Sequence, residues 1–161
     1  KENLPTNLGE FTEPLGVPEV IKEGTDITIV SYGSTFNLCQ IAAIELGQLN
    51  VNVELIDVQT LIPFDINHLI GKSLSKTNRL LIIDEDVSSG ATGYILDKIL
   101  VEQKSYFSLD SAPQTLSAKD HRPAYGTDGD YFSKPSIDDI IEKAYAIMHE
   151  YDPKEYPAIY S

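Results

Sequence analysis

Three features of the sequence carry side chains that could take part in chemistry: a run of acids, a histidine between opposite charges, and a lone cysteine. Asp84-Glu85-Asp86 ends an apolar segment, and carboxylate oxygens are the ligands that a hard cation such as Mg²⁺ prefers. Successive residues of a strand point to opposite faces, so at most two of these carboxylates can converge. The pattern therefore favours a hydrogen-bonded acid at an interface, and we predict no metal-ligating residue.

His121 is the one candidate for a catalytic side chain. It lies between Asp120 and Arg122 in a polar segment, where it could act as a general acid and base or bind an anionic substrate. No second catalytic residue accompanies it, so a solvated or interface histidine is the favoured interpretation. His68 and His149 fall on predicted helices, and we expect both at the surface.

Cys39 and Gly33-Ser34 have simpler explanations than catalysis or ligand binding. Cys39 lies on the apolar face of a predicted helix, where a small buried hydrophobe is more common than a nucleophile. Gly33-Ser34 follows the first predicted strand, but it belongs to neither the G-x-G-x-x-G pattern of dinucleotide sites nor the Gly-Lys-Ser/Thr pattern of P-loops. A turn whose serine caps the next helix is favoured over a phosphate site.

The elements that position these residues alternate between strand and helix. Apolar segments rich in β-branched residues predict strands at 26–32, 51–58, 79–84 and 114–118. Helical periodicity begins after Gly33-Ser34-Thr35, at Asp65, at about Ala91 and at Ser136. This order predicts an α/β domain, a three-layer αβα sandwich around a mostly parallel sheet of about five strands.

The chain divides into three parts. Residues 1–24 hold prolines and glycines without a sustained period, which predicts an arm or linker from an upstream domain. Residues 25–150 form the predicted domain, and residues 151–161 are a tail expected to lie on another surface. The polar stretch 119–135 is long for a compact domain and favours a functional or partner-covered loop. Because the chain begins with Lys1, we expect a fragment of a longer protein.

Charge excludes two classes of partner. Twenty-five acids and twelve bases give a net charge of −13, which would repel nucleic acid and anionic membrane surfaces. The acidic surface serves solubility or steers a basic protein partner. A single cysteine excludes an internal disulfide and any multi-cysteine metal site, and it fits a reducing cytoplasm.

Six segments together make the sequence similar to a known family. They are P-L-G-V-P-E-V (14–20), E-G-T-D-I-T-I-V-S-Y-G (23–33), E-L-I-D-V-Q-T-L-I-P-F-D (54–65), R-L-L-I-I-D-E-D with the glycines after it (79–93), L-D-S-A-P (109–113) and K-P-S (134–136). Over about residues 14–149 the chain resembles the C-terminal domain of the transketolase superfamily. It is most similar to the beta half of the thiamine-diphosphate-dependent decarboxylating component of 2-oxo-acid dehydrogenases.

Two departures and one further likeness accompany this resemblance. The family often has D-x-P-x-P where this chain reads Asp120–Tyr125, and a tail rich in tyrosine and proline follows His149. Y-G-T-D-G-D-Y-F-S-K-P (125–135) is similar to the variety in which the alpha and beta halves form one polypeptide.

The resemblance implies a non-catalytic role for this part of the enzyme. Thiamine diphosphate and magnesium would bind between two other domains of the parent enzyme, which also supply its catalytic residues, so no cofactor-binding residue is expected here. This domain would join subunits, as a homodimer or with other subunits, and would dock the basic subunit-binding domain of the acyltransferase. The substrate would be a branched-chain 2-oxo acid or, as the second choice, pyruvate.

Two acidic residues are the candidate partner-binding residues. The resemblance matches Asp110 to a docking aspartate of the family, and Glu102 lies on the preceding helix, which can present an acidic surface with it. Alternatively, Asp110 caps the turn before Pro113. For the chain as a whole, a free-standing flavodoxin-like module that binds a small ligand and a pure dimerisation domain remain the alternatives.

Overall fold

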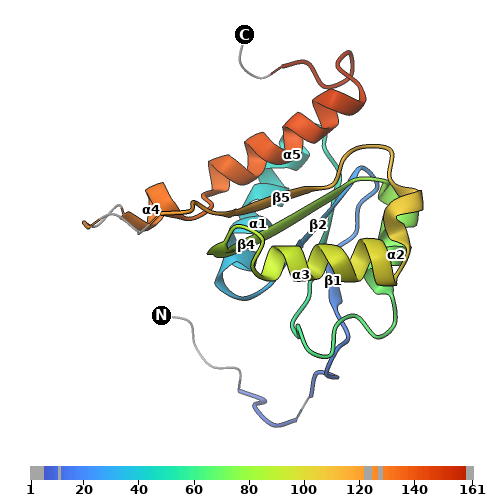
Figure 1. Ribbon diagram of the computed structural model, residues 1–161, viewed down its shortest axis with the longest axis vertical. Coiled ribbons are helices and arrows are strands. Elements are labelled where there is room, and N and C mark those ends of the chain that lie inside the picture. Colours follow the sequence, from blue (N-terminus) through green and yellow to red (C-terminus); the bar gives the residue numbers. More distant parts are fainter. Residues whose placement is uncertain (1–5, 11, 122–124, 127–128, 159–161) are drawn as a thin grey trace.

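The chain forms a five-stranded sheet with helices on both faces (Figure 1). The computed structural model describes residues 6–10, 12–121, 125–126 and 129–158. The strand order is β1-β3-β2-β4-β5. The strands are β1 (Glu19–Lys22), β2 (Ile27–Ser31), β3 (Val53–Asp57), β4 (Leu80–Val87) and β5 (Gln114–Ala118). The pairs β2–β3, β2–β4 and β4–β5 are parallel, whereas β1 runs antiparallel to β3.

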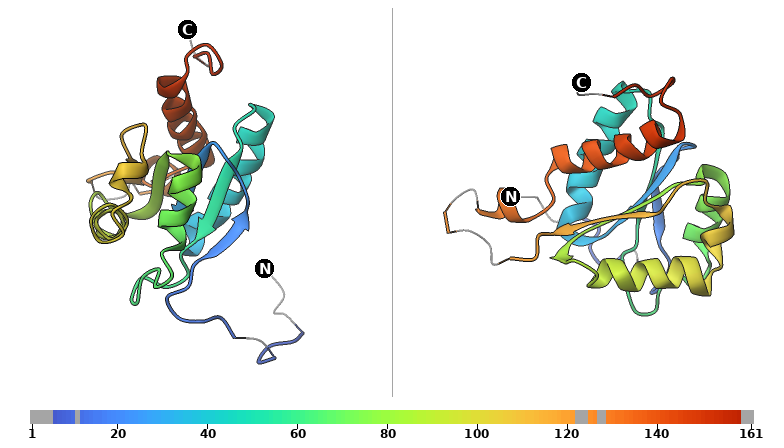
Figure 2. Two further views of the ribbon diagram at one scale, coloured as in Figure 1. Left: turned by 90° about the vertical axis from the view of Figure 1, so that its right-hand side faces the viewer. Right: turned by 45° about the horizontal axis from the view of Figure 1, so that its top comes forward.

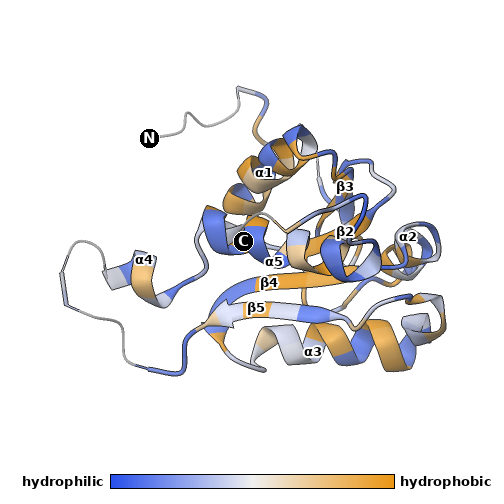
Figure 3. Cartoon of the chain, turned by 90° about the horizontal axis from the view of Figure 1, so that it is seen from above, coloured by the Kyte–Doolittle hydropathy of each residue, from blue (hydrophilic) through white to orange (hydrophobic). Residues whose placement is uncertain are grey.

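Two apolar clusters, one on each face of the sheet, hold the helices in place. The α-helices are α1 (Gly33–Gln48), α2 (Leu69–Thr77), α3 (Ala91–Asp97), α4 (Gly129–Ser133) and α5 (Ile137–Tyr151). Ile27 and Ile29 of β2 point to α1 and α5, while Val30 points to the side of α2 and α3. The same alternation in β3 and β4 places apolar side chains in both layers. Figures 2 and 3 show the helices on the two sides of the sheet. The predicted three-layer α/β sandwich is confirmed.

The predicted strands and helices agree with the structure except at their ends. Asp65, predicted to cap the second helix, accepts hydrogen bonds from the amides of Leu69 (2.8 Å) and Ile70 (2.9 Å), but α2 begins at Leu69 and its N-cap residue is His68. The helix predicted to begin at about Ala91 changes after α3 into a π-helical turn, η1 (Lys98–Glu102), which a 3₁₀ turn, η2 (Ser105–Ser108), follows. Within the predicted loop 119–135, α4 is an additional short helix.

Two expectations about the ends of the chain were wrong. Residues 19–22, assigned to the arm, form β1 at the edge of the sheet, because their backbone pairs with β3. The tail returns to its own domain: Tyr156 is buried in the cluster beneath α5. Its ring and that of Tyr145 form a T-shaped pair with centroids 6.2 Å apart, and its carbonyl oxygen lies 2.7 Å from Nδ1 of His149. No helix among the described residues has the length and apolar character needed to cross a bilayer.

Candidate functional site

The carboxyl ends of β2 and β4 mark the first place to look for a site. The chain leaves β2 toward β3 and then crosses back to β4 on the other side, and folds of this type bind ligands at such a switch point. Here Tyr32 donates a hydrogen bond to Asp84 (2.9 Å) and Ser34 donates one to Glu85 (3.1 Å). Lys134 forms an ion pair with Glu85 at 3.1 Å.

At the carboxyl ends of β2 and β4, Tyr32, Ser34 and Lys134 therefore bind the carboxylates of Asp84 and Glu85. Burial, followed by the hydrogen bond to Asp84 and the charges of the three neighbouring carboxylates, raises the pKa of Tyr32 well above its ordinary value, which keeps its hydroxyl a donor. The sequence predicted that a serine caps the first helix, but the N-cap residue of α1 is Tyr32, whose side chain makes no capping hydrogen bond. The hydroxyl of Ser34 donates to Glu85 instead. Among the described residues no group of three or more potential ligands could hold a metal ion.

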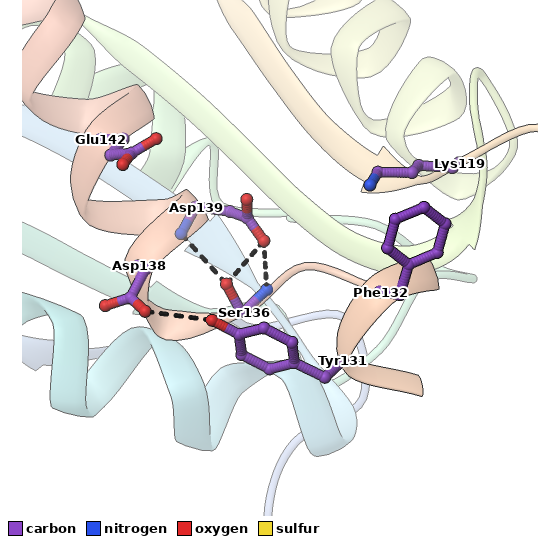
Figure 4. A pocket seen from close by; sticks show the side chains of 7 residues that line it. All are labelled: Lys119, Tyr131, Phe132, Ser136, Asp138, Asp139 and Glu142. Carbon is purple, nitrogen blue, oxygen red and sulfur yellow. Dashed lines mark hydrogen bonds between the residues drawn. The ribbon is translucent and has the colours of Figure 1, made fainter. Parts of the chain in front are cut away.

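His121 packs beside a second hollow, at the start of α5. Its ring centroid lies 5.6 Å from that of Phe132, and Phe132 lines a cavity of about 450 Å³ (Figure 4). In that cavity Asp139 is engaged in a capping box with Ser136, and the hydroxyl of Tyr131 donates to Asp138. Asp138 and Asp139 are thus engaged with residues at the start of the helix, and a catalytic role for His121 stays a prediction.

The other single residues have structural surroundings. Cys39 is fully buried, and burial raises the pKa of its thiol to about 12, so the predicted buried hydrophobe is confirmed. His68 is exposed at the start of α2, as expected. His149 was expected at the surface, but it is only half exposed because it contacts the tail.

Asp110 belongs to a cluster of contacts around Arg79, at the amino ends of β4 and β5. Nη2 of the buried Arg79 lies 2.6 Å from Oδ2 of Asp110, and Nη1 donates to the carbonyl of Asp26 at 2.8 Å. The guanidinium carbon lies 3.4 Å from the centroid of the Tyr151 ring. The Asp110 amide donates to the carbonyl of Asn78 at 3.0 Å. The alternative that Asp110 caps the turn before Pro113 is wrong for its side chain, whose partner is Arg79.

Asp110 also lines a groove on the surface. The groove has a volume of about 630 Å³, and its lining consists of two aromatic residues of η2, the loop that follows and one acid of α5: Tyr106, Phe107, Leu109, Asp110, Ser111, Ala112, Pro113 and Glu150. The Asp110 side chain remains 37% exposed despite its ion pair. It can therefore meet a partner from a position that Arg79 fixes.

Glu102 lies at the end of η1 and does not join this groove. Its carboxylate is exposed and forms an ion pair with Lys98 at 2.5 Å. No contact between Glu102 and Asp110 is present in the part of the chain that the structure describes. The two acids predicted as one docking surface are thus both accessible, but each has a separate cationic neighbour.

Sequence reasoning missed Arg79, Tyr151, Tyr106 and Phe107. One signal in the sequence could have indicated Tyr106 and Phe107: two adjacent aromatic residues precede the L-D-S-A-P segment. Adjacent large apolar side chains of this kind are informative when they are exposed, because they can mark a contact with another molecule.

Comparison with known proteins agrees with this architecture. The beta subunit of the pyruvate dehydrogenase E1 component of Mesostigma viride is 32% identical over 149 residues, which cover 92% of this chain and 44% of that protein. The mitochondrial 2-oxoisovalerate dehydrogenase subunit beta of Chaetomium thermophilum is 34% identical over 113 residues, covering 70% and 24%. The chain therefore spans less than half the length of these relatives.

A solved structure and a family model place the fold. The structure of a split-gene transketolase, an inactive beta4 tetramer, matches with a TM-score of 0.70 at 20% identity, covering 86% of this chain and 44% of that one. The family model described as "Transketolase, C-terminal domain" matches residues 16–134, which include all five strands. The chain therefore belongs to the transketolase C-terminal domain family, as its motifs predict.

Proposed function

We propose that this chain is the C-terminal domain of the beta half of a thiamine-diphosphate-dependent 2-oxo-acid dehydrogenase, where it joins subunits and docks the acyltransferase. The observation that carries the docking role is the Asp110 carboxylate, which is held by Arg79 and remains exposed at a groove. The net charge of −13 supports a basic partner. Relatives that act on pyruvate and on 2-oxoisovalerate leave both substrates within the proposal.

The residues of this chain do not fit thiamine diphosphate. The edge where the fold would bind a ligand presents Asp84, Glu85 and Asp86, and Lys134 is already paired with Glu85. A diphosphate would meet like charges there. We therefore assign the cofactor, its magnesium ion and the decarboxylation to other parts of the parent enzyme. The same charges disfavour a flavodoxin-like module that binds a phosphate-bearing ligand.

Subunit assembly is the second part of the proposal. Tyr125, Tyr131 and Phe132 are exposed around α4, in the stretch 119–135 that was expected to need cover, of which residues 122–124 and 127–128 lie outside the described residues. Exposed aromatic groups of this kind mark interaction surfaces. Sedimentation at high protein concentration should show a dimer, and a strict monomer would argue against assembly through this domain alone.

The docking role can be tested by calorimetric titration with the acyltransferase's subunit-binding domain. The unmodified chain should bind, and Asp110→Asn should weaken binding at least about tenfold, as for a hydrogen-bonded interfacial charge. Glu102→Gln should have a smaller effect, because Glu102 does not line the groove that contains Asp110. Glu45→Gln, on α1 and outside the lining of the groove, is the matched control. Equal affinities for all four proteins, or no binding at all, would reject the docking role.

A further inference from the structure

The outer face of α1 exposes two isoleucines. Ile41 is 43% exposed and Ile44 is 63% exposed, and residues three positions apart on a helix are neighbours. The inner face of α1 packs against the sheet and α5, on the side away from α2 and α3, and Figure 3 shows α1 at the outside of the molecule. Large apolar side chains that lie together in solvent can mark a contact with another molecule.

The exposed residues of α1 follow the spacing by which two helices pack together. Asn37, Ile41, Ile44 and Gln48 are all exposed, and the steps between them are four, three and four positions. Alternating steps of four and three keep side chains on one line along a helix, as at the a and d positions of a coiled coil. α1 has 16 residues and is therefore about 24 Å long, so the line runs over most of its length.

This line of side chains carries no charge. Charged residues make up 23% of the chain, but Glu45, beside the line, is the single charged residue of α1. The solvent face of a surface helix is ordinarily charged or strongly polar. Two isoleucines between two neutral amides instead give an apolar centre with a polar rim, which is the composition of a contact between proteins.

The symmetry of the spacing favours a second copy of this chain as the partner. The steps four, three and four are the same in both directions, with their midpoint between the two isoleucines. If two α1 helices pack antiparallel about a two-fold axis at this midpoint, Ile41 faces Ile44 of the second copy, and Asn37 faces Gln48 of the second copy. Isoleucine then packs on isoleucine and amide on amide, as a self-complementary contact requires.

The net charge of the chain supports the same choice of surface. Each copy carries a charge of −13, and like charges placed together across an interface oppose binding. Two copies that meet through α1 bring uncharged side chains together. In the antiparallel arrangement Glu45 flanks Leu38 of the second copy instead of another acid.

We propose that two copies of this domain associate through α1, with Ile41 and Ile44 at the centre of an antiparallel helix pair. The inference rests on the proposed function only in that subunit assembly is part of both. It assigns the contact between identical chains to α1 and leaves the aromatic residues around α4 to other subunits. A single helix pair is a small contact beside the roughly 1,600 Å² of a standard interface, so the dimer of this chain should be weak.

Sedimentation equilibrium over a wide range of chain concentrations tests the surface. Ile44→Glu should raise the dimer dissociation constant at least about tenfold, because it places a charge in the apolar centre. Ile41→Gln should raise it about threefold or more, because an amide replaces part of the apolar contact. Val101→Glu is the matched control, since Val101 lies on η1 and is 66% exposed. Val101→Glu and Phe132→Ala should stay within about twofold of the unmodified chain.

Disulfide cross-linking tests the antiparallel register. Cys39, the single native cysteine, is buried and should not compete. A mixture of Ile41→Cys and Ile44→Cys chains should cross-link at least about threefold faster than either variant alone, because antiparallel pairing places positions 41 and 44 opposite each other. Faster cross-linking within each variant than in the mixture would overturn the two-fold arrangement.

The outcomes separate this inference from the proposed function. An unmodified chain that stays monomeric at every concentration, or equal dissociation constants for Ile44→Glu and Val101→Glu, would reject the α1 contact. If Phe132→Ala alone weakens the dimer, subunit assembly stands and the α1 contact is wrong. If Ile44→Glu loses the dimer but the acyltransferase's domain does not bind the chain, the docking role fails and the α1 contact stands. Because Ile44 is exposed, thermal unfolding of dilute Ile44→Glu should match the unmodified chain, which excludes misfolding as the cause of a loss.

Discussion

Replacing Asp110 by asparagine tests whether the Arg79 cluster stabilises this domain. The change keeps the shape of the side chain but removes the charge that faces Arg79. Breaking a fully buried ion pair costs about 3–5 kcal/mol, whereas an exposed pair contributes about 0–1 kcal/mol. The Arg79 side chain is 7% exposed and that of Asp110 is 37% exposed, which places this pair between the two cases.

The remaining contacts of Arg79 moderate the loss. The guanidinium keeps the carbonyl of Asp26 and the ring of Tyr151, but its Nε already lacks a partner in the described part of the chain. We therefore expect Asp110→Asn to lower the free energy of unfolding by about 2 kcal/mol. For a domain of this size, that corresponds to a fall of about 4–8 °C in the unfolding midpoint.

Differential scanning calorimetry at neutral pH measures this effect. Glu102→Gln is the control, because it removes an equivalent charge from an exposed pair within one helical turn and should leave the midpoint unchanged. Arg79→Lys should also be destabilised, since an ammonium group cannot both stack on Tyr151 and reach two acceptors. A midpoint for Asp110→Asn within about 1 °C of the unmodified chain would show that Arg79 does not depend on this carboxylate.

Three further predictions concern other parts of the domain. In Gly24→Ala, the new Cβ would lie 2.2 Å from the backbone carbon of Val53 and 2.3 Å from the amide nitrogen of Glu54. Urea unfolding should therefore show that the free energy of unfolding falls by about 3 kcal/mol. An unchanged urea midpoint would contradict this packing. The thiol of Cys39 should react with an aromatic disulfide reagent only at the rate of unfolding, because it is buried and its pKa is raised to about 12; fast reaction in the folded protein would refute its burial. Burial raises the pKa of Glu54, but hydrogen bonds from Lys76, Ser73 and the Gly24 amide outweigh it and hold that pKa below its ordinary 4.5. The stabilisation by the Glu54 carboxylate is therefore complete above about pH 4.5 and is lost as pH falls through its pKa in the folded protein. Below pH 4.5, the free energy of unfolding of the unmodified chain should fall more steeply than that of Glu54→Gln. Parallel plots of unfolding free energy against pH for the two proteins would show that this carboxylate does not contribute.

The parts of the fold that sequence predicted are those with a local signal. Gln114–Ala118 is a strand with the predicted bounds, and the last helix begins at Ser136, its N-cap, as predicted. β1 has only four residues, and partly and fully exposed positions alternate along it, so nothing in its own sequence distinguishes it from a linker. It becomes a strand because β3 offers an edge.

The candidate site was predictable only in part, because its contacts join distant segments. Asp110 could be selected from a motif, but its partner Arg79 is 31 residues away and the carbonyl of Asp26 lies 53 residues from Arg79. The tail also depends on contacts with other segments: after α5 the chain turns back, and Tyr156 is buried against Tyr145 of that helix. Local composition indicated a polar end of the chain and could not show that return.

As an edge strand, β1 also determines whether the sheets of two chains can pair with each other. It is short, its register shifts between Val20 and Lys22, and Lys22 binds the carbonyl of Val53 at 3.0 Å. Short, irregular and charged margins discourage strand-to-strand aggregation. A chain cut after Glu23 would leave the unpaired backbone of β3 as a regular, apolar margin. Such a shortened domain should form oligomers by edge pairing, and its association state would then reflect the missing strand instead of the native contacts between subunits.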